Sequence, residues 1–253
     1  MPRKARAKSI TGIYHVMLRG INKQNIFEDD EDKQKFMQVF TLYKKTCEFE
    51  VYAYCLMNNH VHFLIKEGKE ELSKIIKRIG TKYVYWYNWK YERTGHLFQD
   101  RFKSEAVEDD GYLLMISRYI FQNPVKAGMV NKIFNYKWSG YNDYFGKGGI
   151  CDYGLILSIL SPKEERAKER YTKFMNEEND DKCLEMEENQ RLTDKEIVDI
   201  IKRVGKLKNV NELQRLDIER RDNILRELRK VKGLSIRTIA RITGINRGVV
   251  LKA

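Results

Sequence analysis

Apolar residues recur with two different periods along the first half of the chain, and together these periods predict seven elements. Runs rich in β-formers predict strands over residues 13–19, 51–57, 61–66 and 102–108. Apolar positions at helical spacing predict helices that follow the acidic start 28–31, cover 71–92 and cover 112–122. The order strand, helix, strand, strand, helix, strand, helix is that of an α+β, ferredoxin-like antiparallel sheet with crossover helices.

Two local signals sharpen this outline. Asn58-Asn59 is a turn-prone pair between two β-rich runs, so we expect a hairpin there. Pro124 disfavours helical geometry in the residue before it, so we expect the third helix to stop at that point.

Beyond about residue 147 the pattern turns helical and the charge changes abruptly. Asn176–Gln190 holds seven acids and one lysine, which is typical of a solvated linker. We therefore interpret 148–190 as a helical connector and acidic linker that follows a first domain at 11–147. From Ile201 to the end there are 15 basic and 5 acidic residues on amphipathic patterns. We therefore expect a separate basic helical domain over 191–253, and a basic N-terminal arm over 1–10.

Within that last domain, residues 235–250 fit a helix-turn-helix. Ala240 is small where two helices must touch, and Gly244 follows at the turn, where a positive φ is easiest for glycine. Ser235 and Asn246 are suitable N-caps for the two helices. An ordinary corner of two helices with no DNA contact is the alternative.

Composition and charge narrow the class of partner. The chain has 253 residues, and its 48 Lys and Arg against 36 Asp and Glu give a net charge of +12, which favours a polyanionic partner. The four cysteines form no C-x-x-C pair, so we expect reduced thiols and a cytoplasmic protein. No run of 18 apolar residues occurs, so no membrane span or membrane partner is expected.

The sharpest chemical feature is His60-Val61-His62 in the second hairpin strand. Because strand side chains alternate, both histidines emerge on one face, about 7 Å apart between Cα atoms, and could converge on one metal ion. Two surface or half-buried histidines without a metal are the alternative. No acid follows at the spacing of a dinuclear zinc hydrolase, which disfavours that class.

A second feature is the pair Tyr119 and Asn123 on the third helix. They are four residues apart and share a face if the helix persists. A tyrosine hydroxyl can act as a covalent nucleophile, and an amide oxygen is a hard ligand suited to Mg²⁺ or Mn²⁺. Alternatively, Tyr119 is a core aromatic and Asn123 a cap before Pro124.

Taken together, these residues resemble the HUH single-strand DNA transposases, and particularly the REP-associated tyrosine transposases. The resemblance spans roughly residues 10 to 147, with Phe98 where relatives often have Trp. It is carried by the following segments: Tyr14-His15-Val16 with Arg19-Gly20, His60-Val61-His62, the stretch 95–104, Tyr119-Ile-Phe-Gln-Asn-Pro-Val-Lys126 and the stretch 138–144.

The resemblance implies that His60, His62 and Asn123 hold Mg²⁺ or Mn²⁺, and that Tyr119 attacks single-stranded DNA beside a hairpin. The intermediate would be a 5′-phosphotyrosine, and its stored bond energy means that no nucleotide cofactor is needed. Relatives include monomers and dimers that exchange the tyrosine helix, so a homodimer is left open.

Several basic and polar residues are candidates for DNA contact. Arg3 and Lys4 lie in the basic arm, and the C-terminal arginines Arg237, Arg241 and Arg247 would add affinity. The segments that carry the resemblance contribute Arg19, Gln99, Arg101 and Lys103. Six aromatics within 82–91 could stack on bases, although helical geometry places most of them in the core.

Two rival functions remain open at this stage. One is a non-catalytic nucleic-acid-binding regulator that uses the C-terminal helix-turn-helix. The other is a metal-dependent nuclease that uses water, in which Tyr119 would be dispensable.

Overall fold

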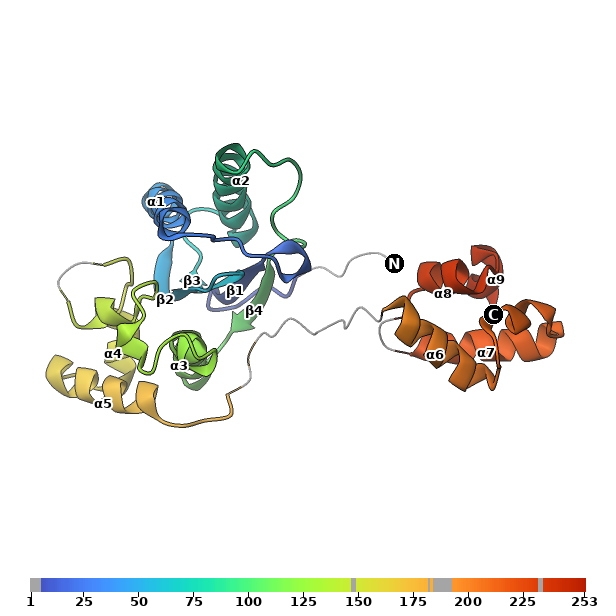
Figure 1. Ribbon diagram of the computed structural model, residues 1–253. Helices are drawn as coiled ribbons and strands as arrows, with labels where there is room; N and C mark the ends of the chain where they lie inside the picture. Colours follow the sequence, from blue (N-terminus) through green and yellow to red (C-terminus); the bar gives the residue numbers. More distant parts are fainter. Residues whose placement is uncertain (1–5, 147–148, 182, 184–192, 232–233) are drawn as a thin grey trace. The chain divides into compact units, whose positions relative to one another are not determined.

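The structure, a computed structural model, describes residues 6–146, 149–181, 183, 193–231 and 234–253. The chain divides into two compact units, Met1–Glu185 and Met186–Ala253 (Figure 1). Arg3 and Lys4 of the expected basic arm lie outside the described residues.

The first unit is built on a four-stranded antiparallel sheet with the strand order β2-β3-β1-β4. The strands are β1 (Ile13–Arg19), β2 (Glu50–Leu56), β3 (His60–Lys66) and β4 (Lys103–Val107). In this order the two strands of the β2–β3 hairpin are followed by β1, which pairs with both β3 and β4. The predicted antiparallel sheet with crossover helices is confirmed, and so is the hairpin at Asn58-Asn59.

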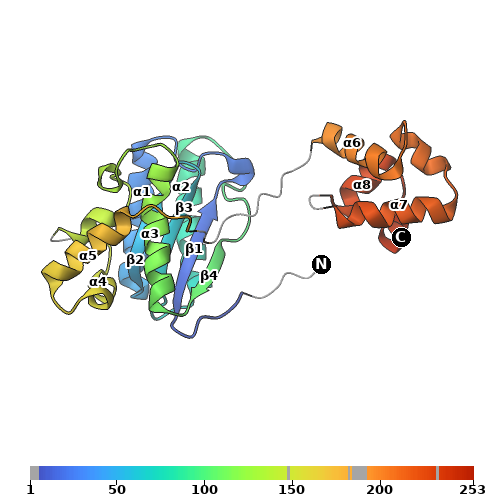
Figure 2. The same ribbon diagram turned by 90° about the horizontal axis from the view of Figure 1, so that it is seen from below.

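Helices lie on both faces of this sheet. α1 (Asp30–Cys47) and α2 (Leu72–Lys90) cover one face, and α3 (Asp110–Lys126) covers the other (Figures 1 and 2). The acidic start of α1 forms a capping box, in which Asp29 and Asp32 each accept a hydrogen bond from the backbone N–H of the other. We refer to the two sides as the α2 face and the α3 face.

The predicted end of the third helix is wrong. α3 continues through Pro124 to Lys126. A proline this close to the end of the helix removes a single intrahelical hydrogen bond, and burial of Ile120 and Phe121 against the sheet outweighs that loss. The consequence is that Asn123 is a helical residue rather than a terminal cap.

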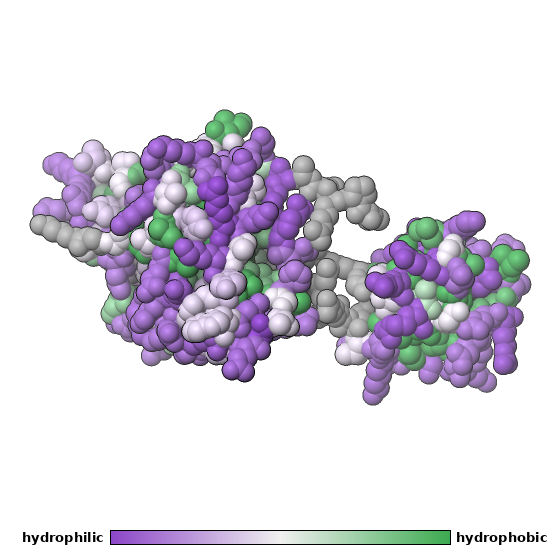
Figure 3. Space-filling view, turned by 90° about the horizontal axis from the view of Figure 1, so that it is seen from above, coloured by the Kyte–Doolittle hydropathy of each residue, from purple (hydrophilic) through white to green (hydrophobic). Residues whose placement is uncertain are grey.

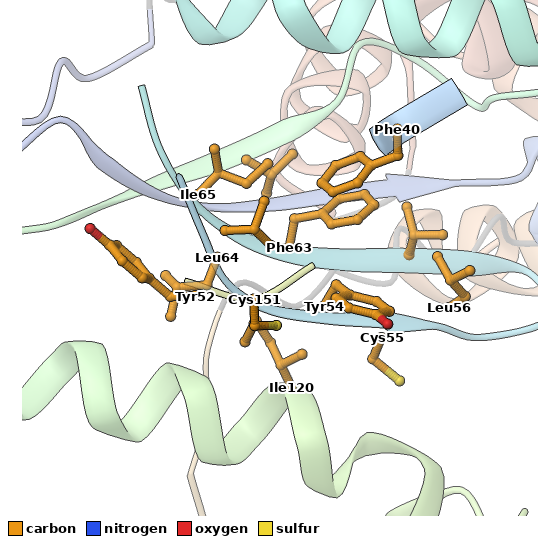
Figure 4. Packing of buried hydrophobic residues seen from close by; sticks show 14 of the residues in the cluster. Phe40, Tyr52, Tyr54, Cys55, Leu56, Phe63, Leu64, Ile65, Ile120 and Cys151 are labelled. Atoms are coloured by element: carbon orange, nitrogen blue, oxygen red, sulfur yellow. The ribbon is translucent and has the colours of Figure 1, made fainter. Parts of the chain in front are cut away.

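The pleat of β3 sends alternate side chains to opposite faces of the sheet. Phe63 points to the α2 face, where its ring stacks on Phe40 with 4.4 Å between ring centroids. Leu64 points the other way, and Figure 4 shows it on the side of the sheet that bears Ile120 of α3. Aliphatic and aromatic core residues therefore cover both faces of the sheet. Any polar cluster must lie within the core of one face or at its edge.

Residues 149–176, within the expected connector, pack onto the first unit. α4 (Gly154–Leu160) and α5 (Glu164–Asn176) follow the sheet, and Tyr171 of α5 stacks on Tyr144 with 4.3 Å between ring centroids. Both rings are fully buried. These helices therefore contribute to the core of the first unit. Short 3-10 turns cover Ile21–Lys23, Ile133–Asn135 and Tyr141–Tyr144.

The second unit is helical throughout its described residues. It contains α6 (Asp194–Gly205), a 3-10 turn at Val210–Arg215, α7 (Ile218–Lys230), α8 (Ile236–Thr243) and α9 (Arg247–Lys252). Its core is aliphatic, with Ile201, Leu225, Ile239 and Val250 fully buried.

Within the described residues, no helix has both the length and the apolar character needed to cross a bilayer. Cys47, Cys55, Cys151 and Cys183 are all free thiols.

Candidate active site

Three strand positions bring imidazoles to the α3 face of the sheet. In the register, Arg19 pairs with His60 and Met17 pairs with His62, so the odd residues of β1 share a face with the even residues of β3. His15 belongs to this set and lies beside His62. The expected common face of His60 and His62 is therefore observed, and β1 adds a third imidazole.

The three rings are close to one another. The ring centroids of His60 and His62 are 5.0 Å apart, and those of His15 and His62 are 5.2 Å apart. A hydrogen bond of 3.0 Å joins His15 Nε2 to His62 Nδ1, and His60 Nδ1 lies 2.6 Å from the side-chain oxygen of Asn59. His60 and His62 thus each have their Nδ1 atom in contact with a protein partner.

Helix α3 places Tyr119 and Asn123 over this cluster. The Tyr119 ring meets the rings of His62 and His15 edge-on, with centroids 5.7 and 6.0 Å away. Asn123 hydrogen-bonds the His60 side chain, and its amide nitrogen donates to the Tyr119 carbonyl at 3.3 Å. Phenol, amide and imidazoles, separated by more than 50 residues in the chain, therefore meet within a single molecule.

The histidines are held in the neutral form by their surroundings. Burial lowers the pKa of His15 to about 3 and, together with the positive charge of Arg19, lowers that of His60 to about 4. The pKa of His62 lies well below its usual value, chiefly through burial and then through His15 and His60. Neutral imidazole is the form that donates a lone pair to a metal ion.

Sequence reasoning did not single out His15 as a site residue. A histidine at an odd position of β1 carries no signal by itself, because His15 and His62 are 47 residues apart and their relation depends on the register between two strands. The one signal that could have identified His15 is its place in Tyr14-His15-Val16, a segment that carries the family resemblance.

Glu105 of β4 extends the cluster. His15 pairs with Glu105 in the register, and His15 Nδ1 lies 4.0 Å from Glu105 Oε2. Both atoms are buried and neither has a hydrogen-bond partner among the described residues. The row therefore consists of the buried rings of His62 and His15 and then Glu105, whose side chain is 36% exposed.

The geometry fits a single cation between His60 and His62. A ring centroid lies about 3.2 Å from a metal bound to that ring, so two imidazoles on one tetrahedral or octahedral ion have centroids about 5 Å apart. The observed 5.0 Å agrees. Among the described residues no group of three His, Cys, Asp or Glu side chains is arranged to hold a metal, so a third protein ligand has to be another residue type, as Asn123 is.

Arg19 brings positive charge to the same place. It lowers the pKa of both His60 and His62, and its buried Nε has no hydrogen-bond partner among the described residues. Gln99 N–H donates to the Arg19 carbonyl at 2.8 Å, so the segment 96–102 runs beside the end of β1. Gln99 and Arg101 are exposed there, and Lys103 is half-buried on β4.

The arginines of the second unit have different environments. Arg241 is engaged with Asp194 through two hydrogen bonds of 2.8 and 2.5 Å, whereas Arg237 and Arg247 are exposed. The expected turn and caps are confirmed: Gly244 has a φ of 69°, and Ser235 and Asn246 are the N-caps of α8 and α9. The assignment as a DNA-binding helix-turn-helix stays a prediction.

Comparison with known proteins gives a consistent picture for the first unit. Residues 8–123 match the family described as "Transposase IS200 like". A Haemophilus influenzae protein named as a REP-associated tyrosine transposase is 29% identical over 115 residues. That match covers 40% of this chain and 65% of the relative, so the chain spans slightly less than two thirds of the length of that curated protein.

A solved structure supports the fold. The REP-associated tyrosine transposase bound to a REP hairpin matches with a TM-score of 0.50 and 16% identity, and the match covers 61% of this chain and 96% of that one. At this identity the likeness shows the fold. Together with the family match, it confirms the resemblance to REP-associated tyrosine transposases that the sequence motifs indicated.

Proposed function

We propose that the chain, whose residues 8–123 carry the IS200-like transposase signature, is a DNA strand transferase that cleaves and rejoins single-stranded DNA through a tyrosine. The observation that carries this proposal is the meeting of Tyr119 with His60, His62 and Asn123 at one place on the α3 face. A phenol beside a pair of neutral imidazoles offers a nucleophile and two lone pairs for a metal ion, which together suit metal-assisted attack on a phosphodiester.

In this proposal Tyr119 is the nucleophile. Its oxygen attacks the scissile phosphorus, the new bond is a 5′-phosphotyrosine, and the bond that breaks releases a 3′-hydroxyl. The phenol has a reference pKa of about 10, so it must lose its proton during the attack. Arg19 lies close enough to the histidines to bind the phosphate and offset its negative charge.

His60, His62 and Asn123 would hold Mg²⁺ or Mn²⁺. When bound, such an ion polarises the phosphate and stabilises charge on its oxygens. Since imidazole is an unusual ligand for Mg²⁺, Mn²⁺ suits this set of ligands better.

His15 orients the ligand ring of His62. If His62 Nε2 is to present a lone pair, its Nδ1 must carry the proton and donate to His15 Nε2. His15 then carries its own proton on Nδ1, which faces Glu105 Oε2 at 4.0 Å. The Glu105 side chain is 36% exposed, but its buried Oε2 faces His15 and therefore favours the one tautomer of both rings that leaves His62 ready to bind a cation.

The substrate we propose is a DNA hairpin flanked by a single strand. The structural relative is bound to a REP hairpin, and the net charge of +12 suits a polyanion. The second unit would add affinity through Arg237 and Arg247 if its last helices bind DNA.

A covalent-adduct assay tests the proposal. The full chain is incubated with Mn²⁺ and an end-labelled hairpin that carries single-stranded flanks, and the products are separated under denaturing conditions. We expect a protein–DNA adduct that is absent for Tyr119→Phe and lost for His60→Ala. Tyr153→Phe, a tyrosine elsewhere in the same unit, is the matched control and should form the adduct.

Two outcomes would replace the proposal by one of its rivals. Cleavage that survives Tyr119→Phe points to a nuclease that uses water as the nucleophile. Tight binding with neither adduct nor cleavage points to a non-catalytic regulator.

A further inference from the structure

The α2 face carries a hollow that the proposed chemistry does not use. It has a volume of about 730 Å³ and lies between the outer side of α2 and the segment 96–102. A second hollow of about 640 Å³ lies on the other side of the same helix surface, and both are lined by Lys74, Lys77 and Tyr85. Figure 3 views the molecule from the side of α1 and α2 and shows a predominantly hydrophilic surface there. We call this continuous surface the α2 groove.

The α2 groove has an excess of positive charge. Lys74, Lys77 and Arg101 line it together with one acid, Asp100, and none of these three cations forms an ion pair with a carboxylate among the described residues. Arg6 adds a further cation, whose guanidinium lies 3.7 Å from the centre of the Phe102 ring. Burial lowers the pKa of Arg6 most, and the positive charge of Arg101 lowers it further, so the two guanidinium groups act on each other.

The aromatic stretch 83–91, which is the second half of α2 and its C-terminal cap Tyr91, has both buried and exposed rings. Tyr83 and Tyr87 are in the core, with 0% and 2% exposure, whereas Tyr85 is 80% exposed and stands between the two hollows. An exposed aromatic ring beside unpaired cations is the arrangement that holds unpaired bases by stacking.

The α2 groove is also connected to the catalytic site through its wall. Ile21 N–H donates to the Leu97 carbonyl at 2.9 Å, and Gln99 N–H donates to the Arg19 carbonyl at 2.8 Å. The segment that walls the groove is thus hydrogen-bonded to the end of β1, where Arg19 faces the histidines. A strand lying in the groove and over this wall would arrive beside Arg19.

We propose that the α2 groove binds unpaired nucleotides of the DNA substrate, with Lys74, Lys77 and Arg101 on phosphates and Tyr85 stacked on a base. This inference rests on the proposed function, and it adds a second contact region away from the reacting atoms. Single-stranded DNA is favoured over duplex because duplex bases are already stacked on one another and offer no free face to Tyr85. A volume of about 730 Å³ is within the range of sites for small organic groups such as a nucleotide.

The test measures binding of a fluorescent 12-nucleotide deoxythymidine strand to the full chain by anisotropy, without divalent ion so that no cleavage occurs. Tyr85→Ala should weaken binding at least about fivefold, and Tyr85→Trp should restore it because the ring is replaced by another. Lys74→Ala/Lys77→Ala should lower the slope of log affinity against log salt by about 1.4, or about 0.7 for each lost phosphate contact.

Matched controls lie outside the groove. Trp89 is 74% exposed on the same helix but lines neither hollow, so Trp89→Ala should bind as the unchanged protein does. Lys45→Ala/Lys163→Ala removes the same charge from exposed positions elsewhere in the unit and should leave the salt slope much closer to its original value.

The outcomes separate this inference from the proposed function. At saturating hairpin DNA with Mn²⁺ the groove variants should still form the tyrosine adduct, since they touch no reacting atom. The groove inference is overturned if the groove variants bind the 12-mer as tightly as the unchanged protein does. It is also overturned if a duplex of equal length binds as tightly as the 12-mer and with the same dependence on Tyr85. Neither result affects the adduct result. If binding of the 12-mer depends on Tyr85 but no adduct forms, the proposed chemistry is overturned and the groove inference stands.

Discussion

The two faces of one sheet use polar residues in opposite ways. On the α3 face, imidazoles, an amide and a phenol are buried or half-buried, uncharged and connected by specific hydrogen bonds. On the α2 face most inner residues are aromatic and aliphatic, and the groove cations Lys74, Lys77 and Arg101 have no ion pair among the described residues. The properties of a buried polar cluster depend on the position of each atom. Binding by a solvated cationic groove depends instead on its total charge and on a few exposed rings.

The largest expected effect comes from neighbours on β3 that face opposite ways. Phe63→Ala on the α2 face should reduce the free energy of unfolding by about 3–5 kcal/mol, because a fully buried ring leaves a cavity beside Phe40. His62→Ala should have a much smaller effect on stability, yet abolish Mn²⁺ binding. Urea unfolding and Mn²⁺ titration by electron paramagnetic resonance measure the two quantities. Equal loss of stability in both variants would contradict the division between the faces.

A subtler change on the α3 face should affect metal affinity more than stability. His15→Gln keeps a side chain that can hydrogen-bond but removes the ring that aligns His62, so we expect Mn²⁺ affinity to fall about 10- to 100-fold. Nitrogen chemical shifts of labelled histidine should show that His62 loses its preference for one tautomer. An unchanged tautomer and an unchanged affinity would remove His15 from the site.

The smallest expected effect is a pH dependence of stability that belongs to the α3 face. The pKa of His15 is about 3 in the folded protein against about 6.5 when unfolded, so below pH 6.5 the unfolded chain binds more protons and stability falls. From pH 7.5 to 5.5 this amounts to about 1.4 kcal/mol for His15. Metal-free protein unfolded by urea at both pH values measures it, and His15→Leu should lose part of the dependence. A stability that rises toward pH 5.5 would mean that His15 is charged when folded.

Local signals in the sequence were sufficient for most of the secondary structure. Strand and helix periods located β1 to β4 and α1 to α3, and the parity of His60 and His62 was enough to place both on one face. The end of α3 was mispredicted because the local preference at Pro124 was weaker than the burial of the turn before it. Within α2, the division into buried Tyr83 and Tyr87 and exposed Tyr85 also depends on what packs against each side of the helix.

By itself, the sequence determined which chemical groups the protein has, their periodicity and the family they resemble, since these depend on neighbours a few positions apart. Only the tertiary structure decided that His15 and Glu105 lie behind His62, and that Tyr119 and Asn123 lie over the imidazoles. These relations depend on strand register and on the docking of a helix against a sheet. They are set by burial of side chains distant in the chain, which no local pattern encodes.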